Sequence, residues 1–262
     1  FTTLFPNRAA PSHGVFVENR LRHLVSSEQV SARVVAPVPW FPSRASLFGD
    51  YARFAKAPRH EERFGITIEH PRYPVVPKLG MHVAPLLLFL AALPVLRRLQ
   101  ASQDFDLIDA HYFYPDGVAA ALLGRALGKP VTITARGTDI NLIPRHPLPR
   151  KMIRWAGARA AGMIAVSEAL RREMIAQGLP GHRIRTLRNG VDLAMFKPTA
   201  RDETRAELGL TGPTLLSVGH LIARKGHDRV IAALAKLPGY ALLIAGDGPE
   251  RAALDALATA RS

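Results

Sequence analysis

Two adjacent cations, Arg224 and Lys225, stand just before a predicted helix and could hold a phosphate group. An apolar, β-prone run over 214–218 stops at Gly219, and apolar residues then recur at helical spacing up to Leu234. The start of a helix offers unpaired backbone N–H groups and a partial positive charge, so two cations beside it suit a diphosphate. The alternative is a solvated basic turn between a strand and a helix.

Length and composition limit the classes of protein that the chain can belong to. With 262 residues and 48% hydrophobic content it can form a large core and two domains. The absence of cysteine excludes disulfides and thiolate metal sites. Lys and Arg outnumber Asp and Glu by 35 to 21, a formal charge of +14, which favours an acidic partner such as a nucleotide or a phospholipid surface. The basic residues are dispersed and form no recognition-helix or aromatic-platform pattern, so we do not expect a nucleic-acid partner.

Strands and helices alternate regularly through the middle of the chain. The predicted strands are 105–110, 130–135, 162–166 and 184–187, and the predicted helices between them are 117–127, 150–159 and 168–177. This alternation predicts an α/β fold with a parallel, doubly wound sheet. A glycine turn, a proline break and a polar helix follow the last strand, so we expect domains at 1–195 and 196–262, the second with only two strands.

Ligands of such sheets bind where the parallel strands end. His111 could be functional there, or it could be a packed or capping residue. The residues that follow or close the predicted strands are Asp109, His111, Arg136, Gly137, Thr138, Asp139, Ser167, Glu168, Asn189 and Gly190.

Both ends of the chain are abrupt. The first residues, FTTLFPN, predict the end of a buried strand that runs into a loop, and a helix over 15–24 follows Gly14. A glycine here permits close backbone approach to a ligand, but a plain turn glycine is an equal alternative. No signal peptide is visible. We expect the chain to be a piece of a longer protein.

The most apolar run, over 83–99, contains two prolines and is shorter than the roughly 20 residues that a spanning helix needs. A buried helix is the preferred interpretation, and a membrane-surface helix is the alternative. Arg97 and Arg98 close this run. Together with the proline-rich basic segment around Arg72, Tyr73 and Lys78 and the net charge, they predict docking to an anionic membrane.

The order of motifs along the whole chain resembles glycosyltransferase family 4, a large family of retaining enzymes with the GT-B fold of two Rossmann-like domains. LRNGVD, G-x-L-x-x-x-K-G and G-x-G-P-E together, in this order and spacing, carry most of the resemblance. The matching segments are PNRAAPSHGVF, DLIDAHYFYPDG, TARGTDIN, AVSEALR, LRNGVD, GHLIARKGHDRVIAAL and AGDGPE.

The resemblance implies transfer of a sugar from a nucleoside diphosphate-sugar donor to a saccharide or lipid-linked acceptor, with retention of the anomeric configuration. It places such an enzyme in cell-surface polysaccharide or glycoconjugate synthesis, in the cytoplasm or at the inner face of the membrane. It implies that His111 lies near the reacting carbon. No metal is expected, because fixed cations can stabilise the leaving diphosphate. The implied donor-binding residues are Gly14, Arg224, Lys225, Gly246 and Gly248, and those of the acceptor side or cleft are Asp109, Arg136, Asp139 and Asn189.

Two departures from the family pattern affect these expectations. Arg136 begins an R-G-T-D sequence where many members read H-G-x-D, and a guanidinium binds phosphate or carboxylate but cannot replace imidazole in acid–base chemistry. We therefore assign Arg136 to the acceptor side. The family's later E-x7-E glutamate pair lies beyond the end of this chain, so we expect the chain as given to be inactive. The alternatives are a nucleotide-sugar epimerase of the same fold and a non-catalytic fragment that binds anions or a membrane surface.

Overall fold

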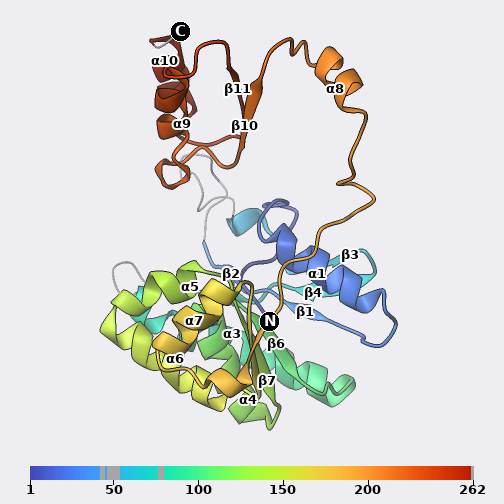
Figure 1. The fold of residues 1–262 in the computed structure, drawn as a ribbon. Coiled ribbons are helices and arrows are strands. Elements are labelled where there is room, and N and C mark those ends of the chain that lie inside the picture. The colour runs from blue at the N-terminus through green and yellow to red at the C-terminus, as the bar shows by residue number, and fades with distance from the viewer. Residues whose placement is uncertain (42–44, 46–53, 76–79, 261–262) are drawn as a thin grey trace. The chain divides into compact units, whose positions relative to one another are not determined.

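The computed structural model describes residues 1–41, 45, 54–75 and 80–260. The chain divides into two compact units, Phe1–Gly190 and Val191–Ser262 (Figure 1). The prediction placed the boundary after residue 195, which is five residues later.

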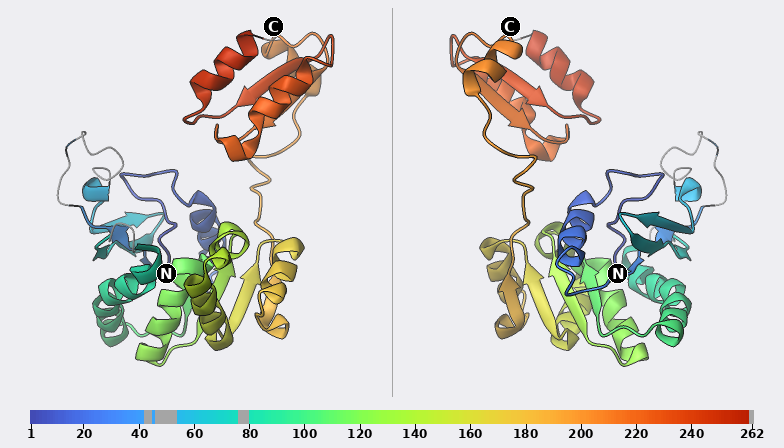
Figure 2. Two further views of the ribbon diagram at one scale, coloured as in Figure 1. Left: turned by 90° about the vertical axis from the view of Figure 1, so that its left-hand side faces the viewer. Right: turned by 90° about the vertical axis from the view of Figure 1, so that its right-hand side faces the viewer.

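The first unit is built on a parallel sheet with helical connections, and Figure 2 shows its helices packed against this sheet. The four strands follow each other in space as they do in sequence. They are β6 (Ile108–His111), β7 (Val131–Ala135), β8 (Gly162–Ala165) and β9 (Ile184–Thr186). The helices between them are α4 (Val118–Leu127), α6 (Pro147–Arg159) and α7 (Glu168–Ala176). The predicted parallel α/β alternation is therefore confirmed.

The first two residues of the chain connect this sheet to a second one. The second sheet has the order β1 (Val34–Val35), β4 (Ile66–Glu69), β3 (His60–Arg63). Thr2 N donates to Val35 O at 3.2 Å, and His111 N donates to Phe1 O at 3.2 Å. Phe1 and Thr2 thus lie between β1 and β6, but they form no assigned strand, so the strand end predicted at the start of the chain is not confirmed. The order of the strands reverses here, and this is where open α/β sheets bind ligands.

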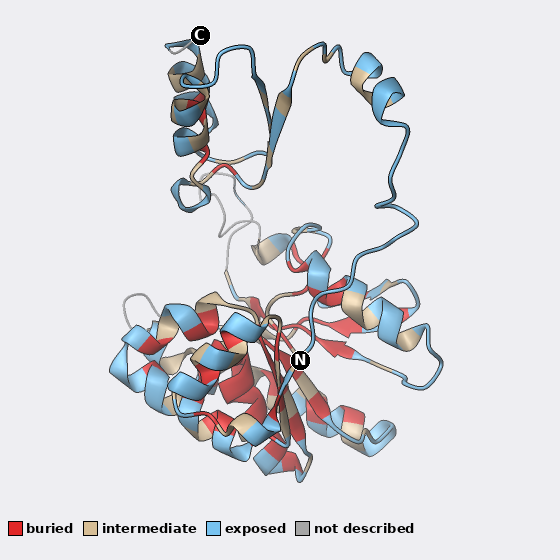
Figure 3. Ribbon diagram, in the orientation of Figure 1, coloured by how far each residue is buried: buried red, intermediate tan, exposed pale blue. Residues whose placement is uncertain are grey.

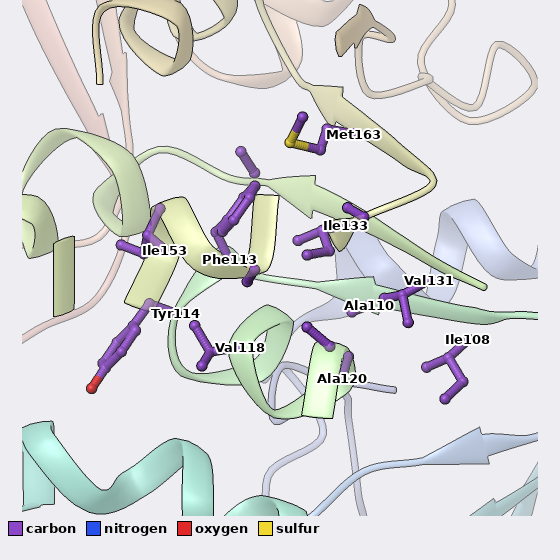
Figure 4. Packing of buried hydrophobic residues seen from close by; sticks show 14 of the residues in the cluster. Ile108, Ala110, Phe113, Tyr114, Val118, Ala120, Val131, Ile133, Ile153 and Met163 are labelled. Atoms are coloured by element: carbon purple, nitrogen blue, oxygen red, sulfur yellow. The ribbon is translucent and has the colours of Figure 1, made fainter. Parts of the chain in front are cut away.

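Alternation along the strands separates the core from the polar face of the sheet. In β6, Ile108 and Ala110 enter the main hydrophobic core, so Asp109 and His111 project to the opposite face. Figure 4 shows Ile133 of β7 and Met163 of β8 beside Phe113 and Ile153 in this core. The apolar face fixes the register of the sheet, and the opposite face carries the polar side chains.

The longest helix, α3 (Gly80–Ser102), packs one face on the same core. Its buried residues recur every three or four positions, as expected of a helix with one face against a sheet. The prediction that this segment is too short to span a membrane was wrong, because the helix runs through Pro85 and Pro94 for 23 residues. Packing of the buried face offsets the cost of interior prolines, about 3 kcal/mol each. Among the described residues, α3 alone has the length and composition to cross a membrane, and 22% of its most apolar 18-residue stretch is buried in the protein.

Short elements were harder to predict than long ones. Helix α1 (Val15–Val25) follows Gly14 as expected. Strands β2 (Val38–Pro39) and β5 (Arg72–Tyr73), which pair in parallel, were not predicted, and neither was α5 (Thr138–Asn141). Arg72 and Tyr73 of the predicted basic segment lie in β5, whereas Lys78 lies outside the described residues.

The second unit has two parallel strands and three helices. The predicted strand over 214–218 is β10 (Thr214–Val218), and its partner is β11 (Ala241–Ala245). Its helices are α8 (Arg201–Glu207), α9 (His227–Leu234) and α10 (Arg251–Thr259). Leu221, Ile231 and Leu254 form its buried cluster, and Figure 3 shows that most of its other positions are exposed or half-buried.

Candidate functional site

His111 closes strand β6 and is engaged through both ring nitrogens. Its Nε2 lies 3.1 Å from Oδ2 of Asp109, two residues earlier on the same face of the strand. Oδ1 of Asp109 accepts a hydrogen bond from the Thr132 hydroxyl of β7 at 2.6 Å. Burial would raise the pKa of Asp109, but the hydrogen bonds from His111 and Thr132 outweigh it and lower the pKa. Burial lowers the pKa of His111, so the pair is a carboxylate beside a neutral imidazole.

Arg136 follows strand β7 and reaches the other side of His111. Its Nη2 lies 2.7 Å from His111 Nδ1, and its Nη1 donates to Oδ1 of Asn189 at 2.8 Å. Its guanidinium also lies over the Phe16 ring, 4.8 Å from the centroid. Because an arginine can only donate, His111 Nδ1 is the acceptor and the imidazole proton is on Nε2. The ends of β6, β7 and β9 therefore bring Asp109, His111, Arg136 and Asn189 together.

Asp139 shapes the loop that carries Arg136. Its side chain is fully buried, and its Oδ2 accepts from Phe113 N at 2.6 Å. Its Oδ1 accepts from Gly137 N at 2.7 Å and from Arg136 N at 3.1 Å. Burial raises the pKa of Asp139 despite these backbone donors. The carboxylate thus positions the backbone of the R-G-T-D loop and is withdrawn from solvent.

A second buried carboxylate, Asp116, fixes the start of the chain beside His111. Its Oδ2 accepts from Thr3 N at 3.0 Å, from the Thr3 hydroxyl at 2.9 Å and from the Thr2 hydroxyl at 3.3 Å. Its Oδ1 is buried and accepts no hydrogen bond from any residue that the structure describes. Burial raises the pKa of Asp116 to about 7. Sequence reasoning missed this clamp, because the contact joins residues more than a hundred positions apart.

Gly14 is required by the local fold whatever ligand it meets. Its φ is 72°, in the left-handed region, and a Cβ added to it would lie 2.4 Å from the carbonyl oxygen of Leu4. The structure therefore gives this glycine a packing role at the start of α1. Its contact with donor phosphates stays a prediction.

In the second unit, the strand, glycine turn and helix occur as the sequence predicts. Arg224 and Lys225 are exposed in a short helical turn, Ala223–Lys225, directly before α9. The Lys225 Cδ lies 3.7 Å from the Cβ position of Gly219, so this lysine follows the turn after β10. No carboxylate of the described residues pairs with Arg224 or Lys225.

The turn after β11 packs tightly on the turn after β10. A Cβ at Gly246 would lie 1.9 Å from Gly219 O, and one at Gly248 would lie 2.5 Å from Leu221 O. Leu221 N donates to Asp247 O at 2.9 Å, and His220 Nδ1 lies 2.5 Å from the same oxygen. Only glycine permits this approach, which holds the two turns side by side at the ends of the strands.

Beneath these turns lies a histidine that sequence reasoning missed. His227, the first residue of α9, is buried, and its Nδ1 lies 3.0 Å from the Ser217 hydroxyl of β10. Its Nε2 is buried and has no hydrogen-bond partner among the described residues. The signal that could have identified it is its place directly after the R-K-G turn.

Two of the other predicted strand-end residues, Ser167 and Glu168, bond to groups of α7 and of the neighbouring strand β9. The Ser167 hydroxyl caps α7 by accepting from Leu170 N at 3.1 Å. Glu168 pairs with Arg171 at 3.1 Å and accepts from the Thr186 hydroxyl at 2.8 Å. In the described part of the chain, no group of three or more His, Asp and Glu side chains is arranged to hold a metal ion.

Comparison with known proteins adds two family matches. The model of Glycosyltransferase Family 4 matches residues 51–195, and that of Glycosyl transferases group 1 matches residues 200–262. The chain is 28% identical over 261 residues to TuaC of Bacillus subtilis (strain 168), a glycosyltransferase assigned to teichuronic acid biosynthesis, covering 97% of this chain and 66% of TuaC.

Two solved structures share the fold. Sucrose-phosphate synthase from Thermosynechococcus elongatus has a TM-score of 0.65 at 16% identity, over 96% of this chain and 63% of its own. HepE of Anabaena in complex with UDP has a TM-score of 0.59 at 22% identity, over 75% of this chain and 53% of its own. The chain thus spans about half to two thirds of the length of these relatives. The first family model covers more than half of the chain. The chain has the Rossmann-like GT-B fold of these glycosyltransferases. The chain belongs to glycosyltransferase family 4.

Proposed function

We propose that the protein transfers a sugar from a nucleoside diphosphate-sugar donor to a saccharide or lipid-linked acceptor, with retention of the anomeric configuration. The observation that carries the proposal is the pair of exposed, unpaired cations, Arg224 and Lys225, directly before α9 and beside the packed turn at Gly219. HepE, which shares the fold, was solved with UDP and with UDP-glucose. That likeness supports a nucleotide-sugar as the donor.

The chemistry of the leaving group explains why such cations are needed. When the bond between the anomeric carbon and the donor diphosphate breaks, negative charge develops on the diphosphate. Fixed cations and helix-start N–H groups stabilise this charge without reorganisation, and removal of one such contact typically slows turnover by about 100-fold or more. No metal is part of this proposal.

The first unit is proposed to hold the acceptor and the reacting end of the donor sugar. His111 has both nitrogens engaged, so it cannot exchange a proton without losing Asp109 or Arg136. We assign it to orientation and charge stabilisation near the reacting carbon. Asp109 and Asn189 fix the two ends of this chain of hydrogen bonds.

The exposed face of α3 supports docking to an anionic membrane, where a lipid-linked acceptor would be presented. Leu86 and Leu90 are 51% and 56% exposed on successive turns, and Arg97 is exposed at the end of the same helix. Arg98 pairs with Glu69, so Arg97 is the freer cation of the two. Each basic residue near an anionic surface contributes on the order of 1 kcal/mol. We place the protein in the cytoplasm, at the inner face of the membrane, in polysaccharide or glycoconjugate synthesis.

Product analysis tests the proposed reaction. Proton NMR of the active enzyme with a nucleotide-sugar and an acceptor should show a new glycosidic anomeric proton of the same configuration as the donor. A product of inverted configuration would contradict retention. Conversion of the nucleotide-sugar without any acceptor would instead indicate an epimerase of the same fold.

A further inference from the structure

The guanidinium of Arg136 is a partly buried cation, and its direct partners among the described residues are all neutral. It donates to the imidazole of His111 and the amide oxygen of Asn189, and it lies over the ring of Phe16. Its Nε is buried and has no hydrogen-bond partner in the described part of the chain. A charge held in this way is normally paired, because an uncompensated buried charge is costly.

The two nearest carboxylates are turned to other donors. The oxygens of Asp139, three residues later, accept hydrogen bonds from backbone N–H groups. Those of Asp109 are engaged by His111 and Thr132. None of the ion pairs among the described residues includes Arg136. The surrounding acids thus attract Arg136 electrostatically but form no direct ion pair with it.

The environment adds a second positive charge. Arg20 of α1 is half-buried and repels Arg136 electrostatically. Burial, and after it this repulsion, outweigh the attraction of Asp109 and Asp139 and lower the pKa of Arg136 to about 10. Arg20 has no carboxylate partner among the described residues either. Arg20 and Arg136 repel each other, and neither forms an ion pair with a carboxylate of the described residues. Such an arrangement favours an anion as the missing partner.

We propose that Arg136 binds an anionic group of the substrate taken by the first unit, either the carboxylate of an acidic sugar or a phosphate. An amide or an imidazole is sufficient to hydrogen-bond a neutral sugar hydroxyl. The planar fork of arginine instead matches the spacing of carboxylate and phosphate oxygens. Because its Nη atoms are fixed by His111 and Asn189, the fork is already oriented and little side-chain entropy is lost on binding. This inference rests on the proposed sugar transfer and specifies the acidic class of its substrate.

The competing interpretation is that Arg136 only braces His111 and Asn189. A bracing residue would be insensitive to the charge of an added sugar, whereas an anion site would discriminate by charge. Arg125 is a matched control, since it lies in the last turn of α4 and lines a surface hollow with Val131, at the other end of β7. Arg125 is exposed and belongs to none of the contacts above.

The test compares glucuronate, glucose 6-phosphate and glucose as probes of the 262-residue chain, with binding followed by titration and by the NMR signal of the Arg136 Nε–H group. One of the two anions should bind at least about tenfold tighter than glucose, as expected for one charge-assisted contact. Arg136→Gln should remove this preference and Arg125→Gln should keep it. Preference for glucuronate assigns the carboxylate, and preference for glucose 6-phosphate assigns the phosphate.

Three results would overturn the inference: equal affinity for the three probes, an unchanged preference in Arg136→Gln, or no response of the Arg136 signal to either anion. If Arg136→Gln fails to fold, Arg136→Lys is used in its place. This variant should lower the affinity for the anion several-fold, because lysine keeps the charge but lacks the planar fork of donors. UDP titrated into the wild type and the variants separately measures nucleotide binding, which is proposed for the second unit. If none of these proteins binds UDP, the result counts against the proposed function and not against the anion site.

Discussion

Arg136 donates a hydrogen bond to Nδ1 of His111 at 2.7 Å, and this contact fixes the tautomer of the histidine. The remaining proton is on Nε2, which faces Asp109 at 3.1 Å. A catalytic base would need a free, basic nitrogen. His111 instead has the geometry of an oriented, neutral imidazole between a carboxylate and a guanidinium.

His111→Ala should therefore cut turnover severely and leave the affinity for a nucleoside diphosphate almost unchanged, because the cations proposed to bind phosphate lie in the second unit. Steady-state rates and titration calorimetry measure the two quantities. A large loss of nucleotide affinity with an intact fold would make His111 a nucleotide-binding or structural residue.

Gly14→Ala should lower the free energy of unfolding by roughly 3 kcal/mol or more, since it combines left-handed strain with a collision against the Leu4 carbonyl. Gly128→Ala is the matched control. Gly128 has nearly the same φ, 69° against 72°, but no atom lies within 4 Å of its Cβ position, so only the strain of about 1–2 kcal/mol applies. Denaturant unfolding of both variants gives the comparison, and equal losses would disprove the close-approach account of Gly14.

Asp116 should make the protein less stable as the pH rises from about 4 to 7. Its pKa is raised from 3.8 to about 7 by burial, so within this window the unfolded chain has released the proton and the folded chain retains it. Unfolding then releases a proton, and stability falls by up to about 1.4 kcal/mol per pH unit. Asp116→Asn should flatten this slope, whereas the exposed control Asp106→Asn should not. The same slope in the wild type and in Asp116→Asn would rule out this carboxyl as the source.

The exposed face of α3, with Leu86, Leu90 and Arg97, should bind anionic vesicles. In a sedimentation assay the chain should pellet with anionic but not neutral liposomes, and rising salt should release it. Replacement of both Leu86 and Leu90 by glutamine should weaken binding, while the control Leu107→Gln, 48% exposed just before β6, should not. Equal recovery in the supernatant with both lipids would indicate a soluble enzyme that acts on a soluble acceptor.

The sequence predicted long periodic elements well and contacts between them poorly. The bounds of β10 were predicted to the residue, because an apolar run that stops at Gly219 marks them. The full length of α3 was missed because prolines argue against a helix until packing on a core offsets their cost. The two-residue strands β2 and β5 leave too few positions for any period to show.

The residues of the site were predicted as a set, but their partners were not. The rule that ligands bind at strand ends selected Asp109, His111, Arg136 and Asn189 without any knowledge of their contacts. That Arg136 meets His111 depends on the pairing of β6 with β7 and on the loop held by Asp139, neither of which the spacing of residues specifies.

The rate of the active enzyme with Arg224→Ala or Lys225→Ala tests the central claim most directly. Both side chains are exposed, so folding should be unaffected, and an exposed lysine of the same unit, Lys236→Ala, is the control. The account predicts a loss of turnover of about 100-fold or more for each of the two variants and none for the control. Steady-state rates within about threefold of wild type for both variants, a difference well below one lost transition-state contact, would contradict the claim that these cations hold the leaving diphosphate.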